Sequence, residues 1–421
     1  MLDIRLLREQ SEKIQSALTR KGIPDNTVAR LLEIDEKRRE FMVHCDEFRS
    51  RQNAENKRIP TLFGAEKELA LAEMKMVSAS LKKAEEELRA VQSFYDDLLN
   101  TLPNPPFSDV PDGGEEDFVV MKEWGDIPEF SFSPKEHWEI AERLGILDME
   151  RGAKVSGSRF YFLREELAIL QMALMNWAFL EIQKLGFSPT IPPFLTRKEA
   201  IFGTGYLQKD ENYVVNPGVD DLYLIGTSEV PLASYYAGEI LEEEEMPKKF
   251  AGYSPCFRRE AGSYGKDTKG ILRVHQFEKI EMVALCLPEE SFSIHEQMRE
   301  AEETLLQKLG IPYRLVLIAA GDLGSSAAKK YDIEAWLPGQ GRYREVTSTS
   351  NCTDFQARRL NIRIRQKNGE IVMAHTLNGT AVSSRPLVAI LENFQHEDGS
   401  VDIPKVLHPF TGGLTRISLK K

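Results

Sequence analysis

The N-terminal quarter of the chain has a long and regular pattern of apolar positions. Between residues 70 and 98, apolar side chains recur at alternating steps of four and three. A strict seven-residue repeat that is sustained over four heptads is typical of a coiled coil. The residues that carry the repeat are Ala70, Met74, Val77, Leu81, Ala84, Leu88, Val91, Tyr95 and Leu98.

A second amphipathic helix, about Thr27 to Arg58, precedes this one. Its apolar positions also step by three and four, although Arg38, Gln52 and Glu55 interrupt the stripe. Residues 60–64 include a proline and a glycine and mark a turn. Two such helices fold back on each other as an antiparallel hairpin, and about 30 residues per helix make an arm ~45–50 Å long. We expect this arm to project into solvent.

The far third of the first helix is basic. It carries Arg49, Arg51, Lys57 and Arg58, with only Glu55 among them. A basic end on a rod of balanced charge suits contact with a phosphate backbone. The alternative is an oligomerisation or scaffolding role, which is the more common use of a coiled coil.

The chain divides into two predicted domains. Residues 101–117 contain four prolines and two glycines, which do not fit a helix. We therefore place a linker at 105–117. It joins an N-terminal domain of residues 1–104, with the hairpin at about 27–99, to a C-terminal domain of residues 118–421.

The C-terminal domain alternates short strand-like runs with a few helices. Neighbouring runs that look like hairpins favour an α+β fold on a largely antiparallel sheet over a doubly wound sheet. The predicted helix 164–185 is apolar nearly all round, so it is buried in a core or an interface. Strands are expected at 213–215, 222–226, 250–258, 271–285, 313–318, 331–337, 342–350 and 371–376, and further helices near 134–144, 228–241, 288–309, 353–361 and 384–394. The acidic run 242–245 is expected to be a solvated helix end.

Charge is spread unevenly over the 421 residues. The formal net charge of −12 is not that of a simple nucleic-acid binder. The first 100 residues carry −1 and the remainder carries −11. An RNA contact is therefore expected on the N-terminal domain only.

Cysteine usage and hydropathy indicate the compartment. The four cysteines are far apart in the chain, so they indicate neither a disulfide framework nor a zinc site. The N-terminus lacks an apolar signal core, and the most apolar stretch, Leu167 to Leu180, is too short to span a bilayer. We expect a reduced, cytoplasmic protein with no membrane contact.

The segment from Tyr253 to Val283 gathers the side chains best suited to chemistry. It runs as two strand-like pieces around a Gly-rich loop, and alternate side chains of a strand share a face. Arg258 and Glu260 therefore lie together on the first piece. A face that carries guanidinium groups, an aromatic ring and carboxylates suits an anionic ligand with a flat base. An ion-paired hairpin on the protein surface would explain the same residues. The corresponding face of the second piece carries Arg273, His275, Phe277, Lys279 and Glu281.

Three stretches, in this order, resemble the motifs of the class II aminoacyl-tRNA synthetases. The apolar helix into Gly186-Phe187, with the strand ending at Pro193, resembles motif 1. Phe257-Arg258-Arg259-Glu260 and the following loop resemble motif 2, and the run from Gly379 to Arg385 resembles motif 3. The long hairpin before such a domain marks the seryl-tRNA synthetases within that class. Further stretches that agree are Gly226-Thr227-Ser228-Glu229, Arg273-Val274-His275-Gln276-Phe277, Gly341-Arg342-Tyr343-Arg344-Glu345 and Gln356-Ala357-Arg358-Arg359.

This resemblance implies that serine and ATP form seryl-adenylate, after which serine moves to the 3′ end of serine tRNA. The serine carboxylate is itself the nucleophile, so the protein must align it with the α-phosphate and neutralise charge. The implied catalytic residues are Arg258, Glu345 and Arg385. The implied ATP-binding residues are Arg258, Arg259, Glu260, Val274, Phe277, Glu345, Val346, Thr347, Ser348 and Arg385.

Within that set the resemblance also implies individual roles. Glu260 takes the adenine amino group, Phe277 stacks on one adenine face, and Arg385 covers the other face and the γ-phosphate. Glu345 and Ser348 hold Mg²⁺ through oxygen atoms, which suit this hard cation.

For serine, the resemblance places Glu281 on the ammonium or hydroxyl group, with Thr380 closing the side-chain end. A site built to hydrogen-bond a hydroxyl rejects alanine strongly, by roughly 10⁴–10⁵, because its own polar groups would be left unpaired. The implied serine-binding residues are Thr227, Ser228, Glu229, Arg258, Glu281 and Thr380.

The resemblance also implies partners. The arm would contact the long variable arm of serine tRNA through Arg49, Arg51, Lys57 and Arg58, and selenocysteine tRNA is a possible second substrate. A homodimer is implied, with the helix 164–185 at its interface. Two alternatives remain open: a carrier-protein ligase that reuses the fold, and a coiled-coil scaffold whose C-terminal domain only packs.

Overall fold

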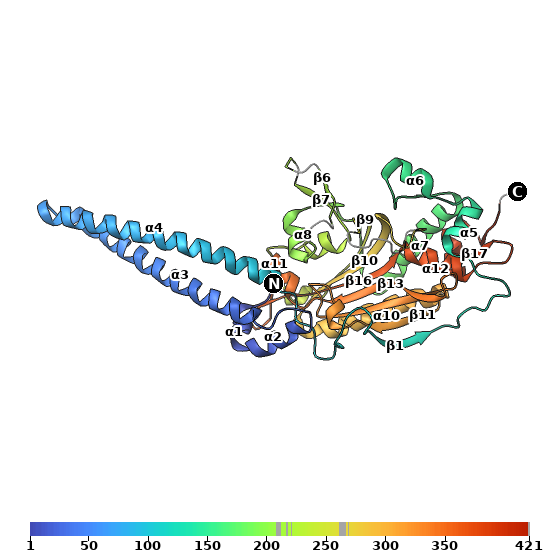
Figure 1. Ribbon diagram of the computed structural model, residues 1–421, viewed down its shortest axis with the longest axis horizontal. Helices are drawn as coiled ribbons and strands as arrows, with labels where there is room; N and C mark the ends of the chain where they lie inside the picture. Colours follow the sequence, from blue (N-terminus) through green and yellow to red (C-terminus); the bar gives the residue numbers. More distant parts are fainter. Residues whose placement is uncertain (208–211, 216–217, 220, 261–266, 268, 420–421) are drawn as a thin grey trace. The chain divides into compact units, whose positions relative to one another are not determined.

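The computed structural model describes residues 1–421 except 208–211, 216–217, 220, 261–266, 268 and 420–421 (Figure 1). The chain forms two compact units, Met1–Pro105 and Pro106–Lys421, and each is described by itself. In the described part of the chain, no helix is both long and apolar enough to cross a lipid bilayer.

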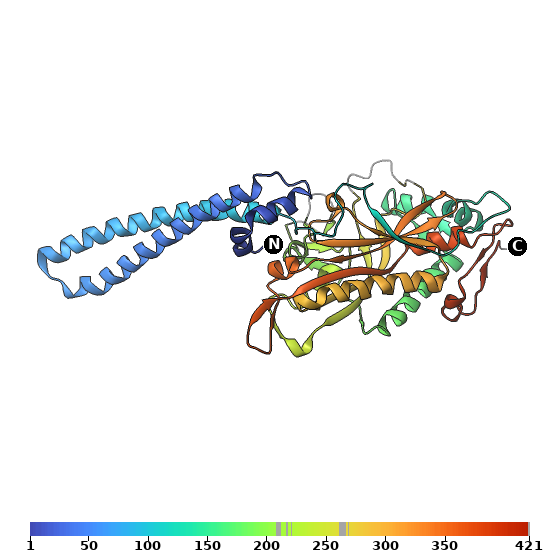
Figure 2. The same ribbon diagram turned by 90° about the horizontal axis from the view of Figure 1, so that it is seen from below.

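The N-terminal unit is a long helical hairpin on a small helical base (Figure 2). Helix α3 (Thr27–Arg58) and helix α4 (Gly64–Thr101) are joined through the 3₁₀ turn η1 (Ile59–Thr61) and pack along each other. The base adds α1 (Ile4–Glu9) and α2 (Ser11–Thr19). The predicted long helix pair is confirmed.

The seam of the hairpin follows the heptad pattern. Every heptad position of α4 is buried or half-buried. Two of the polar residues that interrupt the stripe of α3, Arg38 and Gln52, find partners on α4. The Arg38 guanidinium carbon lies 4.5 Å from the Tyr95 ring centroid, and the Gln52 amide donates to the Ser78 hydroxyl at 3.1 Å. Two of the three interruptions thus make polar contacts between the helices, whereas Glu55 binds Arg58 of its own helix at 2.9 Å.

An eight-stranded sheet is the centre of the second unit. Its strand order is β1-β11-β12-β13-β16-β10-β9-β4, and only the β4–β9 pair is parallel. The predicted α+β fold on a largely antiparallel sheet is therefore confirmed. The strands are β1 (Val119–Trp124), β4 (Ser188–Thr190), β9 (Lys248–Phe257), β10 (Gln276–Cys286), β11 (Tyr313–Leu317), β12 (Lys329–Leu337), β13 (Arg342–Asn351) and β16 (His375–Ser383).

Three helices pack on this sheet and form the main core with it. They are α7 (Glu165–Gln183), α10 (Ser291–Leu309) and α12 (Arg385–Asn393). Buried residues of β10 such as Ile280, Met282 and Ala284 contribute to this core, so the alternate residues of β10 face the other way. That second face of the sheet is where polar side chains gather.

Smaller elements complete the unit. The helices are α5 (His137–Leu144), α6 (Met149–Ser156), α8 (Lys198–Thr204), α9 (Glu229–Ala233) and α11 (Phe355–Leu360), and the short strands are β2 (Leu147–Asp148), β3 (Phe162–Leu163), β5 (Leu195–Arg197), β6 (Val214–Val215), β7 (Leu222–Leu224), β8 (Ile240–Glu242), β14 (Arg363–Arg365), β15 (Ile371–Met373), β17 (Val401–Asp402) and β18 (Arg416–Ile417).

Several local predictions are wrong. The strand expected at 271–285 begins only at Gln276, because residues 271–275 turn and bond to other elements. The helix expected at 228–241 is only the five-residue α9, and the strand expected at 371–376 covers all of β15 and the start of β16. The acidic run forms the end of β8 and the 3₁₀ turn η2 (Glu243–Glu245), not a helix end.

Candidate active site

A β-bulge in β13 decides which of its side chains share a face. The strand has one extra residue relative to β12 at Val346. Such a bulge re-aims the side chains that follow it. Glu345 and Ser348, which are three residues apart, therefore line the same cavity. Thr347 turns to the opposite face, where its hydroxyl donates to Glu302 of α10 at 3.0 Å.

A second bulge lies in the neighbouring strand β16. There Ala381 is the extra residue relative to β10. Thr380 and Ser383 consequently point to the same side of the sheet, and Thr380 lies directly opposite Glu281 of β10. The two bulges together gather on one face side chains that simple alternation would separate.

Two adjoining cavities open on this face. We name them the Phe277 cavity and the Glu281 cavity, and the Glu281 cavity measures about 480 Å³. Both are lined by Arg258, Glu260, Arg273, Lys279, Glu345 and Thr380. The Phe277 cavity adds Ile271, Leu272, Val274, Phe277, Val346, Ser383, Ser384 and Arg385. The Glu281 cavity adds Tyr206, Asn212, Gly226, Phe257, Glu281, Gly324, Ser326, Ala327, Lys330, Ser348, Ser350 and Asn378.

Arg258 lies where the two cavities meet. Its guanidinium donates to the Gly226 carbonyl at 3.1 Å and lies 5.2 Å from the Phe277 ring centroid. Its own carbonyl accepts a hydrogen bond from Nδ1 of His275 at 2.9 Å. Both the side chain and the backbone of Arg258 are thus held before any ligand arrives.

The floor of the Glu281 cavity is a buried ion pair. The Lys279 ammonium lies 2.5 Å from the Glu281 carboxylate, and both side chains are at most 7% exposed. The Thr380 hydroxyl donates to the same carboxylate at 3.1 Å. Pairing and hydrogen bonding compensate the desolvation that burial imposes on both charges.

A second ion pair joins Glu345 to Arg385, at 3.0 Å. Arg385 also donates to the Glu345 backbone carbonyl at 3.0 Å, so it holds two atoms of the same residue. Burial alone would raise the pKa of Glu345, but the charges of Arg385, Lys330 and Arg258 lower that pKa to about 2. The carboxylate is therefore ionised at neutral pH.

Behind the Glu281 cavity lies a buried carboxyl group, Glu229. Its oxygens accept hydrogen bonds from the Tyr206 hydroxyl at 2.6 Å, the Gln356 amide at 2.7 Å and the Asn378 amide at 2.9 Å. Burial first, and then the charge of Glu281, raise the pKa of Glu229 to about 7. Tyr206 and Asn378 line the cavity, whereas Glu229 does not appear on its wall.

Three further residues expected to bind substrates also lie off the cavity walls. The Ser228 hydroxyl donates to the Gly252 carbonyl at 2.8 Å, and the Thr227 hydroxyl accepts from a backbone amide of α9 at 3.2 Å. Arg259 lies 5.6 Å from the ring centroid of Tyr213. Of the other candidates, Glu260 lines both cavities and binds Arg273 at 2.6 Å. Most of the Gly-rich loop, residues 261–266 and 268, lies outside the described residues.

The basic candidates on the arm are all exposed. Arg58 binds Glu55 of its own helix at 2.9 Å, and Arg49 binds Glu85 of α4 at 2.9 Å. Arg51 and Lys57 lie on the exposed surface of the same helix.

Reasoning from sequence assigned no function to several residues that build these cavities. Lys279 could have been found, because it precedes Glu281 by two positions in one strand and therefore shares its face. Tyr206, Gln356 and Asn378 gave no such signal, because they come from three distant segments that the fold brings together around Glu229.

Two protein-family models match this chain. The model "tRNA synthetase class II core domain (G, H, P, S and T)" matches residues 211–394, which include both cavities' strands β9, β10, β13 and β16. The fold and site thus define a class II aminoacyl-tRNA synthetase. The model "Seryl-tRNA synthetase N-terminal domain" matches residues 1–106. With the relatives described next, these matches show that the chain belongs to the seryl-tRNA synthetase family.

Curated relatives match along nearly the whole chain. A serine–tRNA ligase of Thermobifida fusca (strain YX) is 48% identical, over 98% of this chain and 98% of its own. A serine–tRNA ligase of Nocardia farcinica (strain IFM 10152) is also 48% identical over 98% of each chain.

Solved structures agree. A seryl-tRNA synthetase from Pyrococcus horikoshii complexed with ATP is 42% identical, with a TM-score of 0.93 and full coverage of both chains. A cytoplasmic serine–tRNA ligase from Naegleria fowleri in complex with AMP is 36% identical, with a TM-score of 0.88, over 100% of this chain and 99% of that one. A coiled-coil scaffold does not explain similarity that runs through both cavities.

Proposed function

We propose that this protein is a serine–tRNA ligase that forms seryl-adenylate from L-serine and ATP and transfers serine to the 3′ end of serine tRNA. One observation carries the proposal: Arg258 and Glu281 face a common cavity of about 480 Å³. A cation for the carboxylate and the α-phosphate thereby lies across from an anion for the ammonium or hydroxyl group of serine.

ATP occupies the Phe277 cavity in this proposal. The Phe277 ring stacks on adenine, Val274 and Val346 line the base pocket, and Glu260 accepts from the adenine amino group. Arg385 covers the second face of the base and reaches the γ-phosphate. Support comes from the lining of the cavity and from two relatives of the same fold whose structures hold ATP and AMP.

Serine occupies the Glu281 cavity, with its carboxylate toward Arg258. An oxygen of the serine carboxylate attacks the α-phosphorus of ATP in line. The bond between the α-phosphorus and the oxygen that bridges to the β-phosphate breaks, and pyrophosphate leaves. Arg258 binds both the attacking carboxylate and the α-phosphate, so it supplies alignment and charge neutralisation at the same centre. No proton transfer is required in this step, since the nucleophile is already ionised.

Recognition of the serine side chain rests on Glu281 and Thr380. Their hydrogen bond, together with Lys279, fixes the carboxylate before serine binds. Alanine has no hydroxyl to bond to these buried polar groups, so its use relative to serine falls by roughly 10⁴–10⁵, as in other sites built to bind a hydroxyl. Thr227, Ser228 and Glu229 support the cavity from behind, through the Tyr206 and Asn378 contacts of Glu229.

The residues present fit a magnesium ion. Glu345 is ionised at neutral pH and shares a cavity with Ser348, so both offer oxygen ligands. A hard cation bound there would neutralise charge on the departing phosphates. Thr347 would not take part, because its side chain faces α10.

The arm is the tRNA-binding element of this proposal. Arg49, Arg51, Lys57 and Arg58 contact phosphates of the long variable arm of serine tRNA. Selenocysteine tRNA would use the same contacts. Support comes from the exposed cations and from the match of residues 1–106 to the family's N-terminal domain.

A homodimer is part of the same proposal. Helix α7 buries one side in the core but leaves Ile169 at 47%, Met172 at 61% and Leu180 at 43% exposure. With Ile191 and Phe410, residues of this helix line a largely apolar hollow. Apolar patches of this kind mark interfaces between subunits.

Amino-acid-dependent exchange of labelled pyrophosphate into ATP tests the proposal. We expect exchange with serine and at most about a ten-thousandth of that rate with alanine. Exchange with another amino acid in place of serine, or none with any of the twenty, would contradict it.

A further inference from the structure

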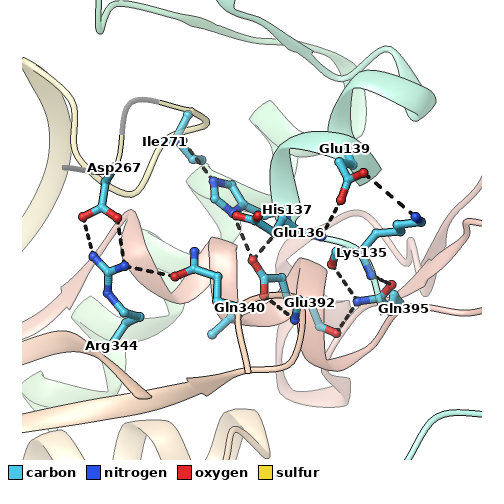
Figure 3. A network of polar contacts seen from close by, with 12 residues as sticks. Lys135, Glu136, His137, Glu139, Asp267, Ile271, Gln340, Arg344, Glu392 and Gln395 are labelled. Atoms are coloured by element: carbon cyan, nitrogen blue, oxygen red, sulfur yellow. Dashed lines mark hydrogen bonds and ion pairs between the residues drawn. The ribbon is translucent and has the colours of Figure 1, made fainter. Parts of the chain in front are cut away.

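A buried histidine holds one wall of the Phe277 cavity, although it does not line the cavity itself. His137 is the first residue of α5 and is 1% exposed. Its Nε2 lies 3.1 Å from the backbone N–H of Ile271, and its Nδ1 lies 3.0 Å from the Glu392 carboxylate (Figure 3). Ile271 and its neighbour Leu272 are cavity-lining residues.

The hydrogen bond to Ile271 fixes the tautomer of this imidazole. A backbone N–H can only donate, so Nε2 must accept and cannot carry a proton. The ring proton is therefore on Nδ1, from which it is donated to Glu392. The imidazole and the carboxylate thereby help to orient each other, as in buried histidine–carboxylate pairs generally.

Glu392 connects this histidine to the opposite wall. It lies near the end of α12, two helical turns after Arg385, which begins the helix and lines the Phe277 cavity. The Glu392 carboxylate also accepts from the His137 backbone N–H at 3.0 Å and from the Gly339 N–H at 2.9 Å. Through Glu392, His137 thus connects Ile271 to the helix that begins with Arg385.

The packing around Nε2 leaves no slack. A Cβ atom placed on Gly270 would lie 2.0 Å from Nε2 of His137, and Gly270 has a φ of +69°. Next to it, the Lys269 ammonium lies 4.3 Å from the ring centroid of Trp138, which follows His137 in α5. The first turn of α5 therefore holds the chain at Lys269, Gly270 and Ile271 in succession.

From this geometry we propose that His137 is a positioning residue for the nucleotide: it fixes the Ile271–Leu272 wall relative to α12 and Arg385. This inference rests on the proposed function, since it assigns the Phe277 cavity to ATP. Ile271 and Leu272 do not line the Glu281 cavity, so the effect is confined to ATP.

Two substitutions separate the two hydrogen bonds of the ring. In His137→Asn the amide nitrogen can replace Nδ1 and keep the bond to Glu392, but nothing accepts from Ile271. In His137→Gln the amide oxygen can replace Nε2 and accept from Ile271. Gly270→Ala is a third variant, in which the added methyl group displaces the ring. The matched control is His295→Asn, which removes another buried imidazole, bonded to the Thr349 carbonyl at 3.2 Å.

The experiment measures KM for ATP and KM for serine in serine-dependent pyrophosphate exchange. We expect His137→Asn and Gly270→Ala to raise KM for ATP about tenfold, with KM for serine unchanged, because each removes one backbone hydrogen bond. We expect His137→Gln to raise KM for ATP much less, because it keeps the bond to Ile271 and because the backbone N–H of residue 137 still binds Glu392 and keeps the link to α12. His295→Asn should change thermal stability but not the ratio of the two KM values.

Equal KM values for the Asn and Gln variants, or a parallel rise in both substrates' KM, would overturn the inference. If the His137→Asn variant does not fold, hydrogen exchange of the Ile271 amide in the wild-type protein tests the same bond. A rapidly exchanging amide would also overturn the inference. A wild-type protein without serine-dependent exchange would instead contradict the proposed function.

Discussion

The arm and the cavities both pair cations with carboxylates, but they do so in opposite environments. On the arm, Arg58 binds Glu55 at 2.9 Å while its side chain stays 56% exposed. In the Glu281 cavity, Lys279 binds Glu281 at 2.5 Å with side chains 7% and 3% exposed. Exposed pairs contribute ~0–1 kcal/mol, whereas removing one partner of a buried pair costs ~3–5 kcal/mol.

The difference indicates what each region can do. An arm cation can leave its carboxylate for a phosphate at little cost, so the arm can bind a nucleic acid without being specialised for one conformation. A cavity cation cannot leave its place, so its orientation is set before the substrates arrive. The predictions below test that contrast.

The largest expected effect is removal of the distal arm. Replacing residues 42–88 by a short glycine–serine turn keeps the base of the hairpin, including the Arg38–Tyr95 contact. We expect serine-dependent pyrophosphate exchange to be unchanged and charging of serine tRNA to be lost. Both are measured on the same preparation. Charging at the wild-type rate would contradict the tRNA-binding role of the arm.

The next effect is expected for Glu281→Ala. Exchange should fall by at least about 10³-fold, because serine loses its carboxylate partner and Lys279 is left unpaired in the cavity. The matched control is Glu334→Ala on β12, which breaks a pair with Arg314 at 2.5 Å that lies outside both cavities. Near-normal exchange by a folded Glu281→Ala protein would exclude its role in serine binding.

A smaller effect is expected for the arm cations. Substituting Arg49, Arg51, Lys57 and Arg58 together by alanine should raise KM for tRNA on the order of tenfold to a hundredfold and leave KM for serine unchanged. The salt dependence should weaken as well, by about 0.7–0.9 in log–log slope for each phosphate that the arm no longer neutralises. The control is a double variant, Arg30→Ala with Lys37→Ala, which removes two exposed cations from the base of the same helix. If the control variant raised KM for tRNA as much as the fourfold variant, the four distal cations would have no specific role in tRNA binding.

The smallest effect is a pH dependence of stability from Glu229. The ordinary pKa of a glutamate carboxyl is 4.5, and the pKa of Glu229 in the folded protein is about 7. Between pH 4.5 and pH 7 the folded state therefore keeps a proton that the unfolded state has lost. Stability from this group therefore falls as pH rises from 4.5 to 7 and is constant above, by up to ~3 kcal/mol in total. In Glu229→Gln this dependence disappears, and the Tyr206 hydroxyl can accept from the new amide.

Thermal unfolding of both proteins between pH 5 and pH 8 measures the difference. We expect the midpoint of the wild-type protein to fall by a few degrees relative to Glu229→Gln over this range, at about 2–4 °C per kcal/mol or less for a chain of this size. A constant difference would show that Glu229 is ionised throughout.

The arm was predictable because its information is local. Heptad spacing fixes the seam, and the predicted first helix and the observed α3 both cover residues 27–58. The sheet's class was predictable for a related reason, since strand-like runs with hairpin neighbours favour antiparallel pairing. The ion pair of Lys279 and Glu281 follows from simple alternation along β10.

The rest of the site depends on contacts that no local pattern encodes. Residues 271–275 have the composition of a strand, yet the Ile271 amide bonds to His137, 134 residues earlier in the chain. The bulges at Val346 and Ala381 depend on which strands lie beside them. The family resemblance named Ser348 as a candidate ligand from its place in the sequence. The bulge explains why its side chain lies on the same face of the sheet as that of Glu345.

The bulge in β13 also predicts how tolerance to substitution should vary along that strand. On an unbroken strand, sensitive positions would fall at every second residue counted from Glu345. Here the alternation shifts by one residue after Val346: positions 345, 348 and 350 line the Glu281 cavity, while the hydroxyl of Thr347 bonds to α10 and that of Thr349 to β16. If the bulge were straightened with every residue kept, the second half of the strand would slip by one register position, and Thr347 and Thr349 would face the cavity in place of Ser348 and Ser350.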